Sequence, residues 1–121
     1  MRTTTAAEVM TRGVLTVDAD WSVGELATFL EHHAISGAPV VDAEGALLGA
    51  VSVTDIARRD GSSKVREIMT PMIFSVDTSA SAQEVADTMI RGRVHRLFVM
   101  EGGRLVGVIS SLDLLSLVRG V

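Results

Sequence analysis

The sequence predicts an α+β fold in which two copies of one β-α-β-β-α unit are related by a pseudo-twofold axis and pack through their sheets. The chain has 121 residues, which is the size of one ordinary domain. Hydrophobic residues make up 47% of it, which is enough to bury a core. One long segment occurs twice in the same register. We therefore expect a single module over residues 1–121, with repeats at 6–59 and 65–121.

The repeat is visible in matching segments at a constant spacing. Glu8-Val9-Met10-Thr11 recurs 59 positions later as Glu67-Ile68-Met69-Thr70. After the loss of one residue in the second copy, residues 49–55 match residues 107–113. One half alone leaves a sheet face exposed and is marginally stable. We therefore expect the halves to pack face to face, with two equivalent clefts between them in which a ligand can bind.

Both copies contain the same order of predicted elements. A capping box, formed by Ser22 with Glu25 and by Ser81 with Glu84, marks the start of a helix that has one apolar stripe. Glycines at 45 and at 102–103 mark the turns of two hairpins, and a polar linker covers 59–63. Apolar runs predict strands at 14–17, 38–41, 47–51, 73–76, 97–100 and 105–109. A short helix closes each copy, at 55–58 and at 113–118.

Composition excludes several classes of function. The chain has no cysteine, so it has neither disulfides nor thiolate chemistry. The net charge of −4 argues against nucleic-acid binding, which depends on many Lys and Arg contacts to phosphate. No apolar run approaches the about 20 residues of a membrane span. We therefore expect a cytoplasmic protein that binds neither nucleic acid nor membrane.

Catalytic and metal-binding patterns are not found in the sequence. It offers no nucleophile–base set, no metal cluster and no phosphate-binding Walker loop. His32 and His33 lack a partner at metal-ligand spacing, and Trp21 is interpreted as a packing residue or a dimer contact. We expect a protein that is not an enzyme and requires no cofactor or metal.

The repeated motifs resemble a tandem pair of cystathionine β-synthase (CBS) domains, also called a Bateman module, of the stand-alone type. The resemblance rests on the Met-Thr pairs, on residues 35–42 (Ile-Ser-Gly-Ala-Pro-Val-Val-Asp) and on Gly-x-x-Ser-x-x-Asp at 49–55 and 107–113. It implies a regulatory module that binds AMP, ADP, ATP or a related adenosyl compound such as S-adenosylmethionine. It also implies a homodimer that controls a protein whose identity the sequence does not reveal.

Two Ser-x-x-Asp pairs, Ser52 with Asp55 and Ser110 with Asp113, stand where the last strand of each copy becomes the closing helix. An aspartate there can accept hydrogen bonds from both ribose hydroxyls. The serine and the free N–H groups of the helix start can hold a phosphate. The alternative is simple N-capping of the helix.

Residues 91–96 concentrate three arginines and a histidine in an acidic chain. Val94-His95-Arg96-Leu97 is similar to the segment of the AMP-activated kinase γ subunit in which His and Arg contact phosphate. By this resemblance His95 and Arg96 are phosphate ligands. The alternative is a solvated turn between helix and strand, which is also the interpretation of Arg91 and Arg93. The first copy has Ile35-Ser36-Gly37-Ala38 there, without positive charge. We therefore expect unequal clefts, the stronger one using His95, Arg96, Ser110 and Asp113.

Four further polar residues belong to the candidate set. Thr16 and Ser75 lie near the end of each first strand, and Thr78 and Ser79 follow in the second copy. In the family this region lines the adenine or ribose pocket, and hydrogen bonding at the strand end is the alternative. Three other functions compete with the sensor: an interaction module with vestigial clefts, a nucleotide-processing enzyme and a DNA-binding protein.

Overall fold

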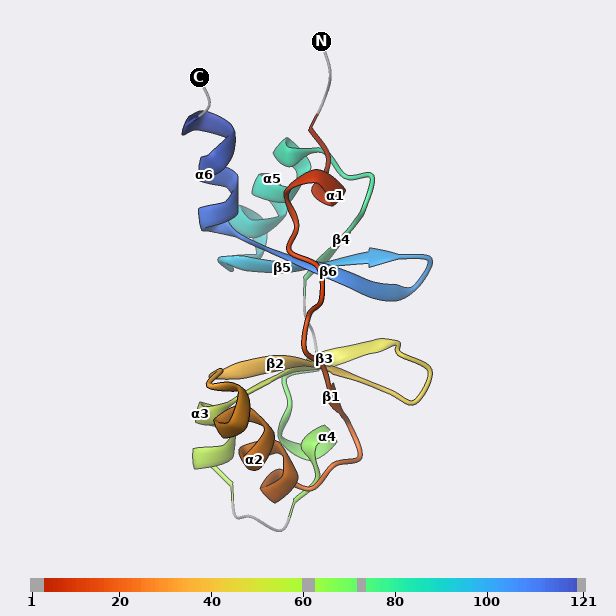
Figure 1. Ribbon diagram of the computed structural model, residues 1–121, viewed down its shortest axis with the longest axis vertical. Helices are drawn as coiled ribbons and strands as arrows, with labels where there is room; N and C mark the ends of the chain where they lie inside the picture. Colours follow the sequence, from red (N-terminus) through yellow and green to blue (C-terminus); the bar gives the residue numbers. More distant parts are fainter. Residues whose placement is uncertain (1–3, 60–62, 72–73, 120–121) are drawn as a thin grey trace. The chain divides into compact units, whose positions relative to one another are not determined.

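The computed structural model describes residues 4–59, 63–71 and 74–119, and its chain divides into two compact units (Figure 1). We name the two units for their place in the sequence. The central unit is Leu15–Ile73, and the outer unit combines the two ends of the chain, Met1–Val14 and Phe74–Val121. Each unit has its own three-stranded sheet and its own hydrophobic core.

The central unit has the sheet order β1-β2-β3, with β1 parallel to β2 and β2 antiparallel to β3. Its helix α2 supplies the buried Leu26 and Leu30 to the core, and β2 and β3 supply Val40 and Val51. Its elements are β1 (Val17–Asp18), α2 (Val23–His33), β2 (Gly37–Val41), β3 (Leu47–Ser52), α3 (Val53–Ala57) and α4 (Val65–Ile68).

The outer unit repeats this arrangement with the sheet order β4-β5-β6 and the same strand directions. Val85 and Met89 of α5 pack on Leu97 of β5 and Ile109 of β6. Its elements are α1 (Ala6–Val9), β4 (Ser75–Asp77), α5 (Ala82–Gly92), β5 (Arg96–Glu101), β6 (Arg104–Ser110) and α6 (Ser111–Arg119). The predicted α+β class and the repeated β-α-β-β-α order are confirmed.

Local sequence signals determine where the long helices begin. The Glu25 N–H donates to Ser22 Oγ at 3.0 Å, and the Ser22 N–H donates to Glu25 Oε1 at 3.0 Å, which completes the predicted capping box of α2. Ser81 and Glu84 form the equivalent box at α5. Gly45, Gly102 and Gly103 have positive φ in the hairpin turns, as the turn positions predict.

The first strand of each unit begins later than the sequence pattern predicts. β1 starts at Val17 rather than at residue 14, because only two of its residues pair with β2: Val17 pairs with Val40, and Asp18 pairs with Val41. β4 starts at Ser75, and residue 73 of its predicted range lies outside the described residues. The closing helices are longer than predicted, since α3 begins at Val53 and α6 at Ser111.

Two short helices that the sequence pattern did not predict complete the units. Ala6 of α1 is fully buried in the outer unit, where its N–H donates to the Ala80 carbonyl at 2.7 Å. Val65 of α4 is fully buried in the central unit, where its N–H donates to the Trp21 carbonyl at 2.9 Å. The segment that leads each sequence repeat therefore packs with the body of the other repeat.

Candidate functional site

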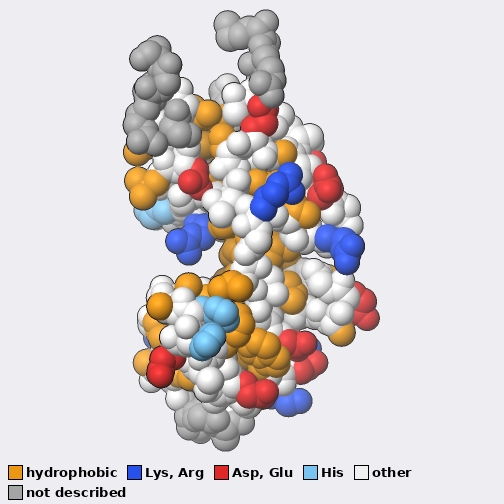
Figure 2. Space-filling view, in the orientation of Figure 1, with side chains coloured by type: hydrophobic (Ala, Val, Ile, Leu, Met, Phe, Trp, Pro, Cys, Tyr) orange, Lys and Arg blue, Asp and Glu red, His pale blue; other side chains and the backbone are white. Residues whose placement is uncertain are grey.

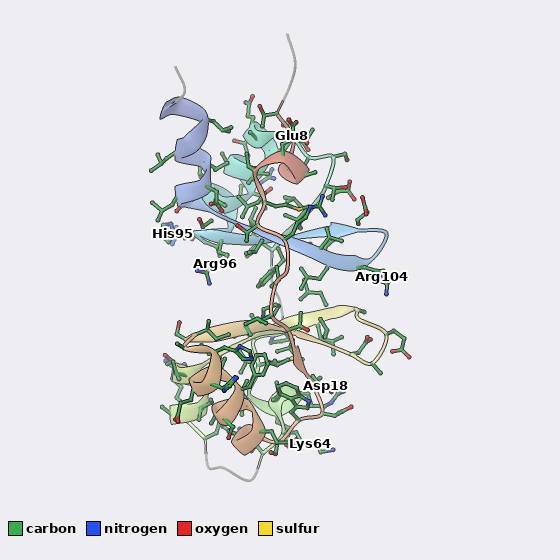
Figure 3. All side chains as sticks on the ribbon, viewed as in Figure 1. Glu8, Asp18, Lys64, His95, Arg96 and Arg104 are labelled. Atoms are coloured by element: carbon green, nitrogen blue, oxygen red, sulfur yellow. The ribbon has the colours of Figure 1, made fainter. Side chains whose placement is uncertain are left out.

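The strand register brings the start of β5 and the end of β6 together. Arg96 pairs with Ser110, and the Ser111 N–H donates to the His95 carbonyl at 2.8 Å. The side chains of His95 and Arg96 are exposed at the end of the sheet where α6 begins (Figure 3). The register thus places the two candidate phosphate ligands beside the start of a nine-residue helix.

The Ser-x-x-Asp pair of the outer unit is ordered by its own hydrogen bonds. The Ser110 N–H donates to Asp113 Oδ2 at 2.7 Å, and the Asp113 N–H donates to Ser110 Oγ at 3.3 Å. This is the N-capping that was the alternative interpretation of the pair. A carboxylate can accept about four hydrogen bonds, so the cap orients the carboxylate without exhausting its capacity to accept others.

Three candidate side chains project from the same face of the β4–β6 sheet. Leu97 and Ile109 are buried beneath the helices, and successive side chains alternate between the two faces of a strand. Arg96 and Ser110 therefore project from the opposite face. Ser75 pairs with Phe98, which lies two residues after Arg96, so Ser75 shares that face. This face therefore carries the cation of Arg96 and the hydroxyls of Ser75 and Ser110, with the side chain of Phe98 on the same face.

Thr78 and Ser79 lie away from this group. They follow the far end of β4, where the Thr78 N–H donates to the Met100 carbonyl at 3.1 Å. Ser79 donates to Asp77 Oδ2 through its hydroxyl at 2.7 Å and through its N–H at 3.0 Å. At about 3.3 Å per residue, the four steps from Arg96 to Met100 correspond to about 13 Å of strand. The structure thus gives these two residues the strand-end hydrogen bonds that were their alternative interpretation.

The central unit has the same frame without the positive charge. The Val53 N–H donates to the Ser36 carbonyl at 2.9 Å, and Gly37 pairs with Ser52, so Ser36 and Gly37 occupy the positions of His95 and Arg96. Asp55 Oδ2 accepts from the Ser52 N–H at 2.8 Å and from its hydroxyl at 3.2 Å. Thr16 directly precedes β1, and its equivalent in the second repeat, Ser75, is the first residue of β4.

Gly37 does more than omit a charge. A Cβ atom added to it would lie 2.9 Å from the Val51 carbonyl oxygen, a backbone atom. Real Cβ atoms are not found so close to a neighbour, so any side chain at this position requires the two strands to shift. The two units are therefore unequal in geometry as well as in charge.

Phe74 is a residue that the sequence analysis missed. Its ring lies against Gly92 at the end of α5, where an added Cβ would be 2.9 Å from ring atoms, and 43% of its surface is exposed. The Phe98 N–H donates to the Phe74 carbonyl at 3.4 Å, which places the Phe74 backbone beside β5. Comparison of the repeats could have identified it, because the first repeat has Leu15 and His33 at these positions.

His32 and His33 belong to an aromatic row on α2. Trp21 meets Phe29 edge to face at 5.2 Å between ring centroids, and Phe29 lies 4.4 Å from His33. Figure 2 shows histidine side chains beside hydrophobic ones on this unit. Within residues 4–59, 63–71 and 74–119, no three His, Asp or Glu side chains gather as metal ligands do.

Two segments of the chain, residues 6–61 and 65–120, match the family model of the CBS domain. The chain belongs to the CBS-domain family. It carries two CBS domains in tandem, as the solved CBS-pair proteins that share its fold do. None of the helices in the described part of the chain has both the length and the apolar character that crossing a membrane requires.

Three proteins illustrate the similarity of this CBS pair to known proteins. The inosine-5'-monophosphate dehydrogenase of Methanocaldococcus jannaschii is 36% identical over 112 residues, which are 91% of this chain and 23% of the dehydrogenase. The cytosolic domain of the Mg²⁺ channel MgtE, solved in complex with ATP, is 33% identical with a TM-score of 0.86, over 94% of this chain and 48% of that one. The CBS pair of protein MJ0100, solved with 5'-methylthioadenosine and S-adenosyl-L-methionine, is 26% identical with a TM-score of 0.79 and covers 98% of both chains.

The extent of the first match limits what it implies. This chain spans less than a quarter of the dehydrogenase, so the match carries no information about dehydrogenase activity.

Proposed function

We propose that this CBS pair is a regulatory module that binds an adenine nucleotide or a related adenosyl ligand, and that it is not an enzyme. The observation that carries the proposal is the register of the outer sheet, which puts His95, Arg96, Ser110 and Asp113 at one end. MgtE was solved with ATP, and the MJ0100 pair was solved with two adenosyl compounds, which supports the ligand class.

Each of the four residues has a separate role in this proposal. Arg96 offers a planar fork suited to phosphate oxygens, and His95 adds a second nitrogen donor. Ser110 holds a phosphate oxygen or a ribose hydroxyl beside the start of α6, where free N–H groups favour anions. Asp113, oriented by its cap, accepts hydrogen bonds from the ribose hydroxyls. Ser75, which shares the sheet face of Arg96, contacts the nucleoside.

The central unit supplies the weaker site of the proposal. Thr16, Ser52 and Asp55 can contact a nucleoside there, but Gly37 leaves the phosphate without a cation. Thr78 and Ser79 stay in the candidate set only as backbone contacts, because their hydroxyls are directed to Asp77.

Thermal melting tests the proposal. AMP, ADP, ATP and S-adenosylmethionine are added in turn at about 1 mM, with GTP for comparison. A ligand at 100 times its dissociation constant stabilises the fold by about 2.7 kcal/mol, which is several degrees for a domain of this size. We expect such a shift with at least one adenine ligand and its loss in Arg96→Ala.

Arg104→Ala is the matched control, because it removes the same charge at the opposite end of the same hairpin (Figure 3). It should keep the full shift. No shift with any adenine ligand, or an equal loss in both variants, contradicts the proposal.

A second candidate function, self-association, is favoured by apolar side chains on the outer unit. Ile90 of α5 is 73% exposed, and Leu112 and Leu115 of α6 are 72% and 54% exposed. Figure 2 shows hydrophobic side chains at the surface around α6. We propose that these residues form a homodimer contact, as in the CBS-pair prediction from sequence. Light scattering should give a dimer for the native chain and a monomer for Leu112→Glu, whereas a dimer in both excludes this surface.

A further inference from the structure

A hollow of about 450 Å³ lies between β4 and α5, separate from the four residues of the proposed nucleotide site. Ala80 and Thr88 line it, and Asp77, Asp87 and Arg91 are among its charged lining residues. Its volume is within the range of small-molecule sites. The proposed function uses none of the side chains that line it.

The central unit fills the corresponding place with its own side chains. In the aligned repeats, Trp21 and Phe29 stand where the outer unit has Ala80 and Thr88. Their rings meet edge to face at 5.2 Å and pack against the core of the central unit. The helix starts are alike, since Ser22 and Ser81 have the same φ and ψ of −73° and 159°. One backbone frame therefore holds two rings in one unit and a hollow in the other.

The lining of the hollow is negatively charged. It contains the carboxylates of Asp77, Glu84 and Asp87 and a single cation, Arg91. Glu84 Oε1 accepts from the Ser81 hydroxyl at 3.2 Å, which holds that carboxylate in place. A bound cation reduces the repulsion among these groups.

Asp77 is ordered in the same way. The hydroxyl and N–H of Ser79, with the hydroxyl of Thr78, hold the pKa of Asp77 below its usual value. The Asp77 carboxylate therefore stays ionised at neutral pH, beside the small apolar surface of Val76 and Ala80.

We propose that this hollow binds a small organic cation with a flat apolar part, whose ring takes the space that Trp21 and Phe29 fill in the central unit and whose charge faces Asp77 and Asp87. The ring lies beside Ala80 and Thr88, where the central unit has its two rings. The charged group lies among carboxylates that are already held in position. An amidinium or guanidinium suits such a site, because its planar donors match carboxylate oxygens.

Benzamidine is the probe, because it combines one flat ring with one amidinium. Titration followed by NMR should move the amide signals of Ala80, Glu84 and Thr88 in a saturable way, with a dissociation constant of about 1–10 mM for so small a ligand. Benzamide, the neutral analogue of the same shape, should bind at least tenfold more weakly. Raising the salt concentration should weaken benzamidine binding, because the charges are exposed.

Two variants locate the site. The double variant Ala80→Trp/Thr88→Phe copies the central unit and should abolish the benzamidine shifts. Asp87→Asn changes an exposed helix position and should weaken binding about threefold without affecting the fold. Glu31→Gln, which removes one exposed negative charge from α2, is the control and should leave the affinity unchanged.

Three results would overturn the proposal. The first is that benzamide and benzamidine shift the signals equally. The second is that benzamidine binds both the Asp87→Asn variant and the double variant as tightly as the native chain. The third is that Mg²⁺ shifts these signals and benzamidine does not. The adenine-ligand shift in thermal melting is measured in parallel. Its retention in the double variant shows that the two sites are separate.

Discussion

At the scale of single residues, one glycine distinguishes the two candidate sites. The first repeat has Gly37 where the second has Arg96, and the space around Gly37 is closed by the backbone of β3. The sequence showed the missing charge, but it could not show the close approach of the strands, which depends on the register between Gly37 and Ser52.

Gly37→Ala should therefore destabilise the protein. The added Cβ would lie 2.9 Å from the Val51 carbonyl oxygen, and relief of such overpacking typically costs about 1–3 kcal/mol. Gly24→Ala on α2 is the control. There the added Cβ has only an ordinary contact with Ser22 Oγ at 3.8 Å, so the change should stabilise the helix by about 0.5–1 kcal/mol. Urea unfolding measures both, and equal effects would show that Gly37 is not confined.

The capping box of α2 predicts a pH dependence. The backbone N–H and hydroxyl of Ser22 hold the pKa of Glu25 below its ordinary value of 4.5. A carboxylate with a lowered folded-state pKa stabilises the fold above its unfolded pKa, and this contribution is lost as the pH falls through the folded-state value. Glu25→Gln should thus reduce the stability difference between pH 7 and pH 3, measured by urea unfolding. An unchanged difference in Glu25→Gln would contradict this role of the capping box.

At the scale of elements, the helices that begin with a capping box were predictable, and the shortest elements were not. α2 and α5 begin directly after Ser22 and Ser81 because the cap and the apolar stripe are local signals. Helices of four residues, such as α1 and α4, are not stable alone and form here only through contacts made far along the chain. β1 is short because only two of its residues find partners.

The residues that follow each short helix cross a strand at a glycine. Residues 69–70, after α4, cross β3 at Gly49, and residues 10–11, after α1, cross β6 at Gly107. Gly49 of β3 faces the backbone of Thr70, which exchanges two hydrogen bonds with Ala50 at 2.8 and 3.0 Å. Gly107 of β6 faces the flexible side chain of Met10 instead. A backbone cannot move aside as a methionine can, so Gly49→Ala should cost more stability than Gly107→Ala. Urea unfolding tests this order, and the reverse order would contradict the packing described.

The candidate site was also predictable only in part. His95, Arg96, Ser110 and Asp113 were chosen from motifs, and the strand register brings them together. The family resemblance placed Thr78 and Ser79 in the same pocket region as Ser75, but the three residues of β4 carry them to the far end of the strand. Phe74 belongs to no motif, and its importance comes from its contact with Gly92.

At the scale of the whole molecule, the sequence repeats and the spatial units do not coincide. The central unit is continuous in sequence and includes α4, whereas the outer unit needs α1 from the start of the chain. A fragment of residues 15–71 keeps Val65 and Ile68 in its core, and a fragment of residues 6–59 lacks both. We expect the first fragment to unfold more cooperatively in urea, and equal behaviour would show that α4 contributes little.

The asymmetry between the two units predicts one strong adenosyl site for each chain. Isothermal titration of the native chain with the ligand that gives the largest melting shift tests this most directly, compared with Asp113→Asn and Asp55→Asn. Asparagine can still cap each helix but loses the charge-assisted bonds to ribose. Such bonds contribute about 1.5–3 kcal/mol, so Asp113→Asn should weaken binding at least tenfold. Asp55→Asn should leave the strong site unchanged, and an affinity lost in Asp55→Asn but kept in Asp113→Asn would contradict the account.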